Sequence, residues 1–222
     1  MQTNSEPIIT RVYLDLESED LSGNVLLQIS LISEKGDTFN IYINPHKELS
    51  YHCFRFTNLH FYQGSLYKRN LKVESVNIFT ALKELKTWLE NLKSDVSIVA
   101  YNGMGFDNAV LVKHFKLQNI EFPSCVKIFE DPLPCLKKHF KANKPENFKL
   151  ETIAKIFNVE LLDAHNSIDD SNCLKKICEQ FCKLNSISIE EFLKPYSKPA
   201  DHYLNPDQNA TKKQKQSKKS TK

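Results

Sequence analysis

In the stretch VYLDLESED, residues 12–20, two acids, Asp15 and Glu17, are set into and directly after an apolar run. The apolar members predict a buried β-strand: Val12, Tyr13, Leu14 and Leu16. Because side chains alternate along a strand, Asp15 and Glu17 share one face and lie roughly 6–7 Å apart. Burying two carboxylates that close together without a partner is costly. Either that face is open to solvent, or a cation lies between the two acids.

The flanking sequence predicts an α/β sandwich around a mixed sheet. Three strands lead the chain, at Arg11–Glu17, Asn24–Ser33 and Thr38–Asn44, and the last two flank the turn EKGD as a hairpin. Short strands then alternate with helices, an order typical of α/β folds. The strands are VSIVAY (96–101) and VKIF (126–129); the helices are Val76–Leu92, one from Asp107, one from Pro132, Phe148–Phe157, Ser167–Leu184 and Ile189–Leu193. Residues 46–74 show no clear pattern, although Lys68 and Arg69 form an adjacent basic pair there.

The composition indicates one domain followed by a tail. At 222 residues and 41% hydrophobic content, the chain can fill one core. Residues 194–222 carry eight lysines and two aspartates, a net of +6, whereas the preceding residues carry a net of −3. We therefore expect a folded domain over 1–194 and a disordered, lysine-rich tail over 195–222. The tail lysines could contact phosphates, act as a nuclear import signal or keep the chain soluble, and these alternatives stay open.

The sequence predicts an intracellular protein, in the nucleus or the cytoplasm. No run of 18 apolar residues indicates a membrane span, and MQTNSEPIIT lacks the basic start and apolar core of a signal peptide. The six cysteines form no CxxC pair, so reduced thiols are expected.

A second acid lies in AYNGMGFDNAVL, residues 100–111. Gly103 and Gly105 are two of only five glycines in the chain, and together they predict a tight turn or a close backbone approach. Asp107 follows at the start of a helix. Taken alone, Asp107 is explained by a favourable interaction with the helix dipole.

The last acids lie in AHNSIDDSNCL, residues 164–174. The apolar stripe of this helix is formed by Leu174, Ile177, Cys178 and Phe181. At 100° per residue Asp170 lies roughly 30° from the centre of the stripe and Asp169 roughly 130° away, so Asp170 points inward. A capping box with Ser167 would explain the spacing of Asp170 but not its direction. His165 precedes the helix on a loop, where a free imidazole can reach a site.

Four carboxylates at one end of the sheet would attract divalent cations: Asp15, Glu17, Asp107 and Asp170. Two divalent ions balance four negative charges, and hard oxygen ligands favour Mg²⁺ or Mn²⁺ over zinc. Such a pair of ions can activate a water and stabilise the leaving oxygen of a phosphodiester. His165 would then be the general base that takes the proton of the attacking water.

The segments LDLES, AYNGMGFD and AHNSIDD, in that order, resemble the three exonuclease motifs of the DEDDh (DnaQ-like) superfamily. The resemblance covers roughly residues 9–184 and is closest to the three-prime repair and PML-like exonuclease domains. It implies an RNase H-like fold with a mixed five-stranded sheet flanked by helices. It also implies 3′→5′ removal of nucleoside monophosphates from nucleic-acid ends with two Mg²⁺ (or Mn²⁺) ions.

The resemblance also implies roles for single residues. Asp15 would bridge both ions, Glu17 and Asp170 would complete one ion site, and Asp107 would support the other, partly through water. His165 would deprotonate the nucleophile. Three residues match positions that contact the terminal nucleotide or lie beside the second-motif acid: Leu16, Leu21 and Phe106.

One departure from the family pattern follows the first motif. Glu19 and Asp20 stand where the family commonly has Thr-Gly, so two extra negative charges could weaken phosphate binding. An active exonuclease is therefore weighed against a nucleic-acid-binding or scaffolding module with the same fold and little turnover. A third interpretation, an inactive α/β domain with exposed acids, must explain the direction of Asp170 by chance.

The expected partner is nucleic acid with single-stranded 3′ ends, and DNA is favoured over RNA without a decisive residue. No membrane partner is expected. The sequence leaves a homodimer open.

Overall fold

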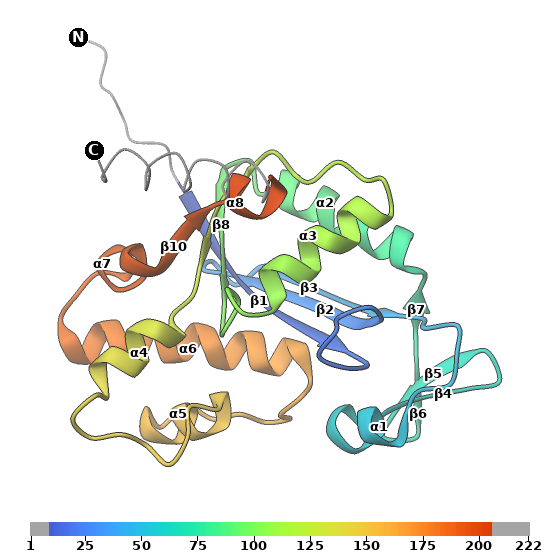
Figure 1. Ribbon diagram of the computed structural model, residues 1–222, viewed down its shortest axis with the longest axis horizontal. Helices are drawn as coiled ribbons and strands as arrows, with labels where there is room; N and C mark the ends of the chain where they lie inside the picture. The colour runs from blue at the N-terminus through green and yellow to red at the C-terminus, as the bar shows by residue number, and fades with distance from the viewer. Residues whose placement is uncertain (1–8, 206–222) are drawn as a thin grey trace, which may run out of the picture.

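The computed structural model describes residues 9–205 and centres on one mixed sheet (Figure 1). The strand order is β10-β9-β8-β1-β2-β3-β7. The strands are β1 Ile9–Ser18, β2 Leu26–Ser33, β3 Thr38–Ile43, β7 Ser75–Val76, β8 Asp95–Ala100, β9 Val126–Glu130 and β10 Ser197–Pro199. β1 is central, antiparallel to β2 and parallel to β8. The predicted hairpin is present, with Gly36 in its turn at a φ of 98° that favours glycine.

Helices cover both faces of this sheet, so the domain has three layers (Figure 1). One face is covered by α2 Ile78–Asn91, α3 Asp107–Leu117 and the short α8 Asp201–Leu204. The other is covered by α4 Leu133–His139, α5 Leu150–Ile156, α6 Ser167–Asn185 and α7 Ile189–Leu193. Along β1, Val12 and Leu14 enter the first core and Tyr13 enters the second. The alternation of a strand therefore places Asp15 and Glu17 on the α6 face.

The predicted α/β sandwich and its elements are confirmed, but the sheet has seven strands and not five. The two additional strands are the short edges β7 and β10. β7 pairs with β3 over two residues, and β10 pairs with β9 over three. Neither segment has an alternating apolar pattern. Each is extended because it pairs with the neighbouring strand, and its own sequence does not favour a strand.

The segment without a clear sequence pattern forms a small module, residues 51–73, at one end of the main sheet (Figure 1). The module comprises helix α1 Tyr51–Thr57 and an antiparallel sheet of β4 Leu59–Tyr62, β5 Ser65–Lys68 and β6 Leu71–Val73. Its core combines Cys53, Leu59 and Leu66 with Leu27 of β2. We call it the α1/β4–β6 module.

The chain stays regular beyond residue 194, where a disordered tail was expected to begin. Residues Lys194–Tyr196 form a 3-10 turn, followed by β10 and α8. Tyr203 of α8 packs its ring 5.0 Å from that of Phe129. The folded domain therefore continues through α8, and the expectation for residues 206–222 lies outside the described residues. Within 9–205, no helix is both long and apolar enough to cross a membrane, and all six cysteines are free thiols.

Candidate active site

Three carboxylates from two distant segments meet at the end of β1. Oxygens of Asp15, Glu17 and Asp170 all lie within 4.8 Å of one another. Glu17 is 8% exposed and Asp170 is 7% exposed, whereas Asp15 is half-buried. The register of β1 against β2 shifts between Glu17 and Ser18, where the strand leaves the regular ladder. The face that carries the two strand acids is thus largely covered by α6, and the acids reach solvent only at its edge, where Asp15 is half-buried and Glu17 lines a pocket.

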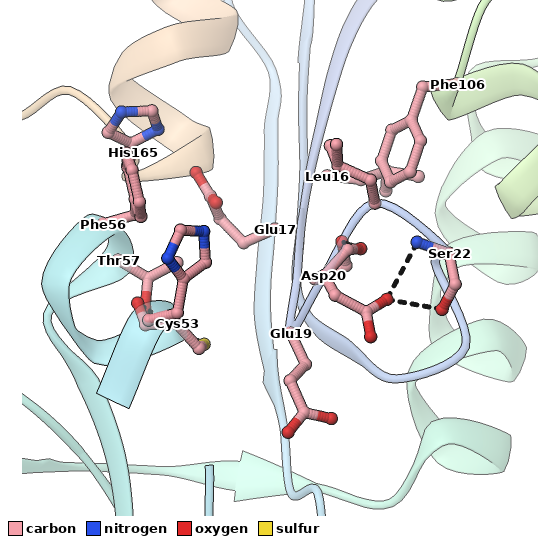
Figure 2. Close-up of a pocket in the computed structure, with 13 residues that line it drawn as sticks. Leu16, Glu17, Glu19, Asp20, Ser22, Cys53, Phe56, Thr57, Phe106 and His165 are labelled. Atoms are coloured by element: carbon pink, nitrogen blue, oxygen red, sulfur yellow. Dashed lines mark hydrogen bonds between the residues drawn. The ribbon is translucent and has the colours of Figure 1, made fainter. Parts of the chain in front are cut away.

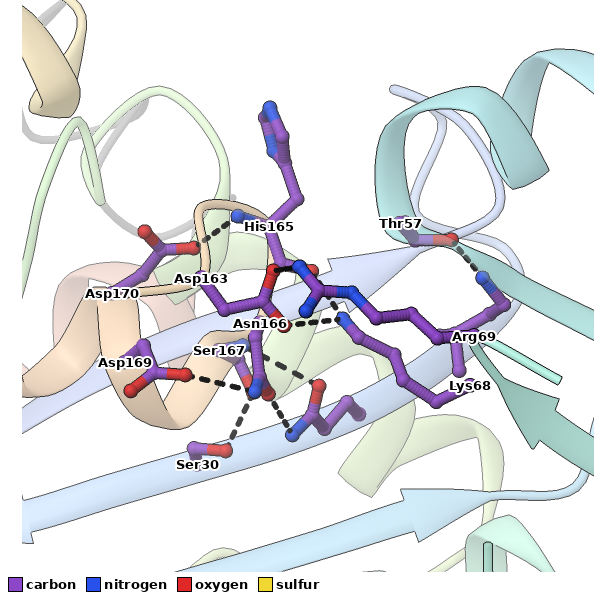
Figure 3. A network of polar contacts seen from close by, with 12 residues as sticks. Ser30, Thr57, Lys68, Arg69, Asp163, His165, Asn166, Ser167, Asp169 and Asp170 are labelled. Carbon is purple, nitrogen blue, oxygen red and sulfur yellow. Dashed lines mark hydrogen bonds and ion pairs between the residues drawn. The ribbon is translucent and has the colours of Figure 1, made fainter. Parts of the chain in front are cut away.

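The inward direction of Asp170, predicted from the helical phase, is confirmed. Helix α6 has Asn166 as its N-cap, and Ser167 lies inside the helix with its hydroxyl 2.5 Å from that of Ser30, so there is no capping box (Figure 3). Asp170 Oδ2 instead accepts a hydrogen bond from the backbone N–H of His165 at 2.9 Å. Asp169 lies on the outer side and accepts from Asn166 Nδ2 at 2.9 Å.

Asp107 approaches the same end of the sheet from the opposite face. It is the first residue of α3, is 6% exposed, and accepts a backbone hydrogen bond from Leu16 of β1. Asp107 is outside the group of three carboxylates within 4.8 Å, yet its charge raises the pKa of both Asp15 and Glu17. The predicted close approach is present at Gly103, where a Cβ would lie 2.6 Å from Cβ of Ala100. The missing side chain lets the turn from β8 into α3 lie close to the strand, where the N–H of Gly103 donates to the carbonyl of Ala100 at 3.1 Å.

All four acids have raised pKa values. Burial, and then the charges of Asp170, Glu17 and Asp107, raise the pKa of Asp15 well above its usual range. Burial and the charge of Asp170 raise the pKa of Glu17 to about 8. Burial raises the pKa of Asp107 to about 7 and that of Asp170 to about 7. Carboxylates crowded in this way resist ionisation because their negative charges repel one another. A bound cation would offset that repulsion, so cation binding would be strongly favoured.

A pocket of about 740 Å³ opens beside the acids, between the β1–β2 turn and α1 (Figure 2). The residues expected to contact a nucleotide line one wall: buried Leu16, Leu21 with 93% of its surface exposed, and half-buried Phe106. The opposite wall comes from the α1/β4–β6 module, which the sequence did not predict. Phe56 of α1 is exposed there, with the ring of His52 at 4.7 Å.

His165 lies at the mouth of this pocket, on the side where Glu17 lies (Figure 2). Its side chain is 46% exposed, and the ring meets the edge of Phe56 at 5.8 Å. Nε2 lies 3.9 Å from Glu151 Oε1. The backbone at His165 is left-handed, with a φ of 63°, an uncommon state for a residue with a Cβ. The surrounding contacts must hold it there.

The two extra acids of the first motif have local partners. Glu19 forms an ion pair with Lys47. Asp20 accepts hydrogen bonds from the backbone N–H of Ser22 at 2.8 Å and from the Ser22 hydroxyl, which lowers the pKa of Asp20 (Figure 2). Both carboxylates are thus paired within or beside the turn that forms the pocket rim.

Lys68 and Arg69, the adjacent basic pair of the segment without a clear sequence pattern, contact the chain itself. Lys68 Nζ donates to the backbone carbonyl of His165 at 3.0 Å. Arg69 pairs with Asp163 at 2.5 Å, and Lys68 Nζ lies 3.7 Å from the same carboxylate. Burial of Lys68 carried no signal in the sequence, since adjacent basic residues are usually exposed.

Comparisons with known proteins give a distant relative and a shared fold. No protein-family model matches the chain. The chain is 22% identical over 173 residues to the DNA polymerase III PolC-type protein of Bacillus subtilis (strain 168), a match that covers 73% of this chain and 11% of that protein.

Solved structures of exonuclease I have a similar fold. The zinc-bound E. coli exonuclease I complex with single-stranded DNA aligns with a TM-score of 0.64 at 15% identity, over 79% of this chain and 41% of that one. A product-bound exonuclease I structure aligns with a TM-score of 0.62 at 16% identity, over 78% of this chain and 43% of that one. The chain thus has the RNase H-like fold of exonuclease I and spans less than half the length of those chains.

Proposed function

We propose that this chain is a divalent-metal-dependent 3′→5′ exonuclease of the DEDDh superfamily, which hydrolyses terminal phosphodiester bonds and releases nucleoside monophosphates. One observation carries the proposal: carboxylates of Asp15, Glu17 and Asp170 lie within 4.8 Å of one another, beside a pocket of nucleotide size. The exonuclease I fold supports it.

The donor set fits two hard divalent cations. Asp15, Glu17 and Asp170 would hold one ion, and Asp15 with Asp107 would hold the second. All four ligands are carboxylates, which favours Mg²⁺ or Mn²⁺. When bound, such ions activate a water and stabilise the charge on a phosphodiester in its transition state. The raised pKa values of Glu17, Asp107 and Asp170 agree with this fit, because a cation would favour the ionised carboxylates.

The pocket would receive the terminal nucleotide. Leu16, Leu21 and Phe106 present apolar surface from one side, and Phe56 presents an aromatic ring from the other. Stacking of a base on an aromatic ring tolerates any sequence, as a general exonuclease requires. With the base held in the pocket, the adjacent phosphate would lie toward the carboxylates.

His165 would take the proton of the attacking water. Its ring is 46% exposed and lines the pocket, where it would be open to a water held beside the carboxylates. An imidazole is the side chain that most often acts as a general base in enzymes. The backbone of His165 is left-handed, and its N–H donates to Asp170. The proposed base and one of the proposed metal ligands are therefore held next to each other.

The substrate would be DNA with a single-stranded 3′ end. The E. coli exonuclease I structures that share the fold are complexes with single-stranded DNA and with dA16 and dT13 oligonucleotides. The pocket opens between two walls that both belong to this chain, a geometry that suits one strand.

The test is an end-resection assay. Purified full-length chain is incubated with 5′-labelled single- and double-stranded DNA and RNA, in Mg²⁺ or EDTA. We expect a metal-dependent ladder that shortens from the 3′ end of single-stranded DNA. The ladder should be absent in Asp170→Asn and present in the matched neighbour Asp169→Asn, whose carboxylate lies on the outer side of α6.

Tight DNA binding without shortening in Mg²⁺ or Mn²⁺ would contradict the proposal and favour the scaffolding module. Shortening that persists in EDTA would contradict the role of the carboxylates.

A further inference from the structure

We propose that Lys68 is a positioning residue for His165, held in place by the α1/β4–β6 module. The proposal rests on the proposed exonuclease function. Lys68 would not touch the substrate or the reacting atoms. It would fix the backbone from which the imidazole projects.

Lys68 is built into the module as a fixed group. It ends β5, paired with Leu59 on one side and with Leu71 on the other. The next residue, Arg69, donates its backbone N–H to the carbonyl of Asn58 at 3.0 Å. Only 8% of the surface of Lys68 is exposed, although an ammonium is costly to bury. Burial accordingly lowers the pKa of Lys68. A lysine retained in such a place is expected to make a specific contact.

That contact is the carbonyl of His165. Lys68 Nζ donates to this oxygen at 3.0 Å, across 97 residues of sequence (Figure 3). The N–H of His165 donates to Asp170 Oδ2 at 2.9 Å. Both backbone polar groups of His165 are thus engaged, one by the module and one by the acid cluster. With both ends of the residue tied, the direction of its Cα–Cβ bond is set relative to the Asp170 carboxylate.

The backbone at position 165 needs such support. Its φ of 63° is left-handed, a state that costs on the order of 1 kcal/mol or more for a residue with a Cβ. Without the Lys68 bond, the peptide after His165 would be held only on its N–H side, where Asn166 donates to the carbonyl of Asp163 at 3.1 Å, and the ring would sample a wider range of directions. A general base must lie within hydrogen-bond reach of the proton that it takes, so such rotation would lower the chemical rate.

The module makes three further contacts with this loop, and they differ in character. Lys68 Nζ itself also lies 3.7 Å from Asp163 Oδ2, a longer contact than its bond to the His165 carbonyl. Phe56 meets the ring of His165 at 5.8 Å, and Arg69 pairs with Asp163. The Arg69 side chain is 59% exposed, and an exposed ion pair contributes little. The buried bond from Lys68 therefore carries most of the restraint.

The test compares Lys68→Met with two matched variants. Lys72→Met removes an exposed lysine from the adjacent strand β6, and Lys68→Arg keeps a donor at the same position. The measurements are kcat and KM on 5′-labelled single-stranded DNA, the Mn²⁺ concentration at half-maximal activity, the thermal midpoint, and hydrogen exchange of peptides that cover residues 161–168.

In Lys68→Met we expect kcat to fall at least about ten-fold, with KM and the Mn²⁺ midpoint within about two-fold of the parent values. Exchange across 161–168 should become at least about ten-fold faster, because the His165 N–H loses its fixed geometry. Lys72→Met should match the parent chain, and Lys68→Arg should keep kcat within about three-fold. A purely structural role for Lys68 would lower the thermal midpoint without this selective loss of kcat.

An unchanged kcat or unchanged exchange in folded Lys68→Met would overturn the proposal. So would a kcat loss matched by an equal shift in the Mn²⁺ midpoint, since the lysine would then act through the charge of the metal ligands. The exchange measurement does not depend on turnover. If the parent chain degrades no substrate, the proposed function fails, while exchange still decides whether Lys68 holds the loop.

Discussion

The two ends of strand β1 carry buried charge on the same face, and they treat it in opposite ways. At the start of the strand, Arg11 Nε lies 3.0 Å from Glu130 Oε2, and Nη1 lies 2.7 Å from Glu190 Oε1. Ser97 adds a hydrogen bond to Glu130 at 2.7 Å. Burial alone would lower the pKa of Arg11, but the two glutamates outweigh it and the pKa is raised. This end is neutralised by its own partners.

Four residues farther along β1, negative charges are no longer matched by positive ones. Asp15 and Glu17 meet Asp170 and the charge of Asp107, and the nearby ammonium of Lys68 is bonded to the carbonyl of His165. The matched charges at the start of β1 indicate a structural role, and the unmatched charges at its end indicate a binding site. A buried charge with a complementary partner holds elements together, whereas an excess of one sign marks a place for a ligand of the other.

The largest expected effect tests whether the unbalanced end is catalytic. Asp15→Asn should abolish turnover, a loss of at least about a thousand-fold or about 4 kcal/mol of transition-state stabilisation, because it removes the ligand shared by both ions. Far-ultraviolet circular dichroism should show an intact fold, and the labelled-DNA assay should show no product. Parent-like activity in Asp15→Asn would erase the functional difference between the two ends.

The second effect tests whether the balanced end is structural. Glu130→Gln removes the buried charged partner of the Arg11 guanidinium and leaves Glu190, whose side chain is 61% exposed, so the free energy of unfolding should fall by about 3 kcal/mol. Urea denaturation of the full chain measures it. As the matched variant, Glu17→Gln in EDTA should be as stable as the parent chain or more stable, because it removes a repelled charge. Equal losses in the two variants would remove the contrast.

The third effect uses pH. In the folded chain the pKa of Glu17 is about 8 and those of Asp107 and Asp170 are about 7, against about 4 for unfolded carboxyl groups. Because these pKa values are raised by folding, their contribution to stability is fully present below about pH 4 and is lost as the pH rises through 7–8. Each group loses about 1.4 kcal/mol per pH unit up to its folded pKa, so in EDTA the free energy of unfolding should fall by on the order of 5 kcal/mol between pH 6 and pH 9.

Saturating Mn²⁺ should reverse most of this fall, since each of two ions at about a hundred times its dissociation constant adds about 2.7 kcal/mol. Thermal melts in EDTA and in Mn²⁺ check both statements. A stability that is flat with pH in EDTA, and that Mn²⁺ leaves unchanged, would contradict the cation site.

The smallest expected effect concerns the pocket rim. Because Glu19 pairs with Lys47 and Asp20 is bonded to Ser22, the two extra acids act on their own turn. The double change Glu19→Thr with Asp20→Gly, which restores the common family residues, should alter kcat/KM by less than about five-fold. The end-resection assay measures it. A gain far above that value would show that the two acids repel the substrate.

Three of the four acids at this end of β1 could be predicted to point toward one face because each has a local signature, which Asp107 lacks. The strand period places Asp15 and Glu17 on one face, and the helical phase turns Asp170 inward and Asp169 outward. Those inferences need only neighbouring residues. The predicted elements along β1 to β3 and in α6 follow from the same short-range periodicity.

The module and the edges were not predictable for the opposite reason. The core of the α1/β4–β6 module includes Leu27 of β2, so its pattern is completed only by a distant strand. Lys68 looks like a surface lysine until the loop at His165 is folded against it. β10 contains Pro199, which does not favour a strand, and it forms only by pairing with β9, about 70 residues earlier in the chain.

The short strand β10 has a consequence for handling the protein. It caps the outer edge of β9, and the N–H of Ala200 donates to the carbonyl of Lys127 at 2.8 Å. A fragment ending at residue 194 would leave the outer backbone N–H and C=O groups of β9 unpaired. Such an open edge promotes edge-to-edge association and precipitation. A fragment extending through α8 keeps the sheet closed against its own copies.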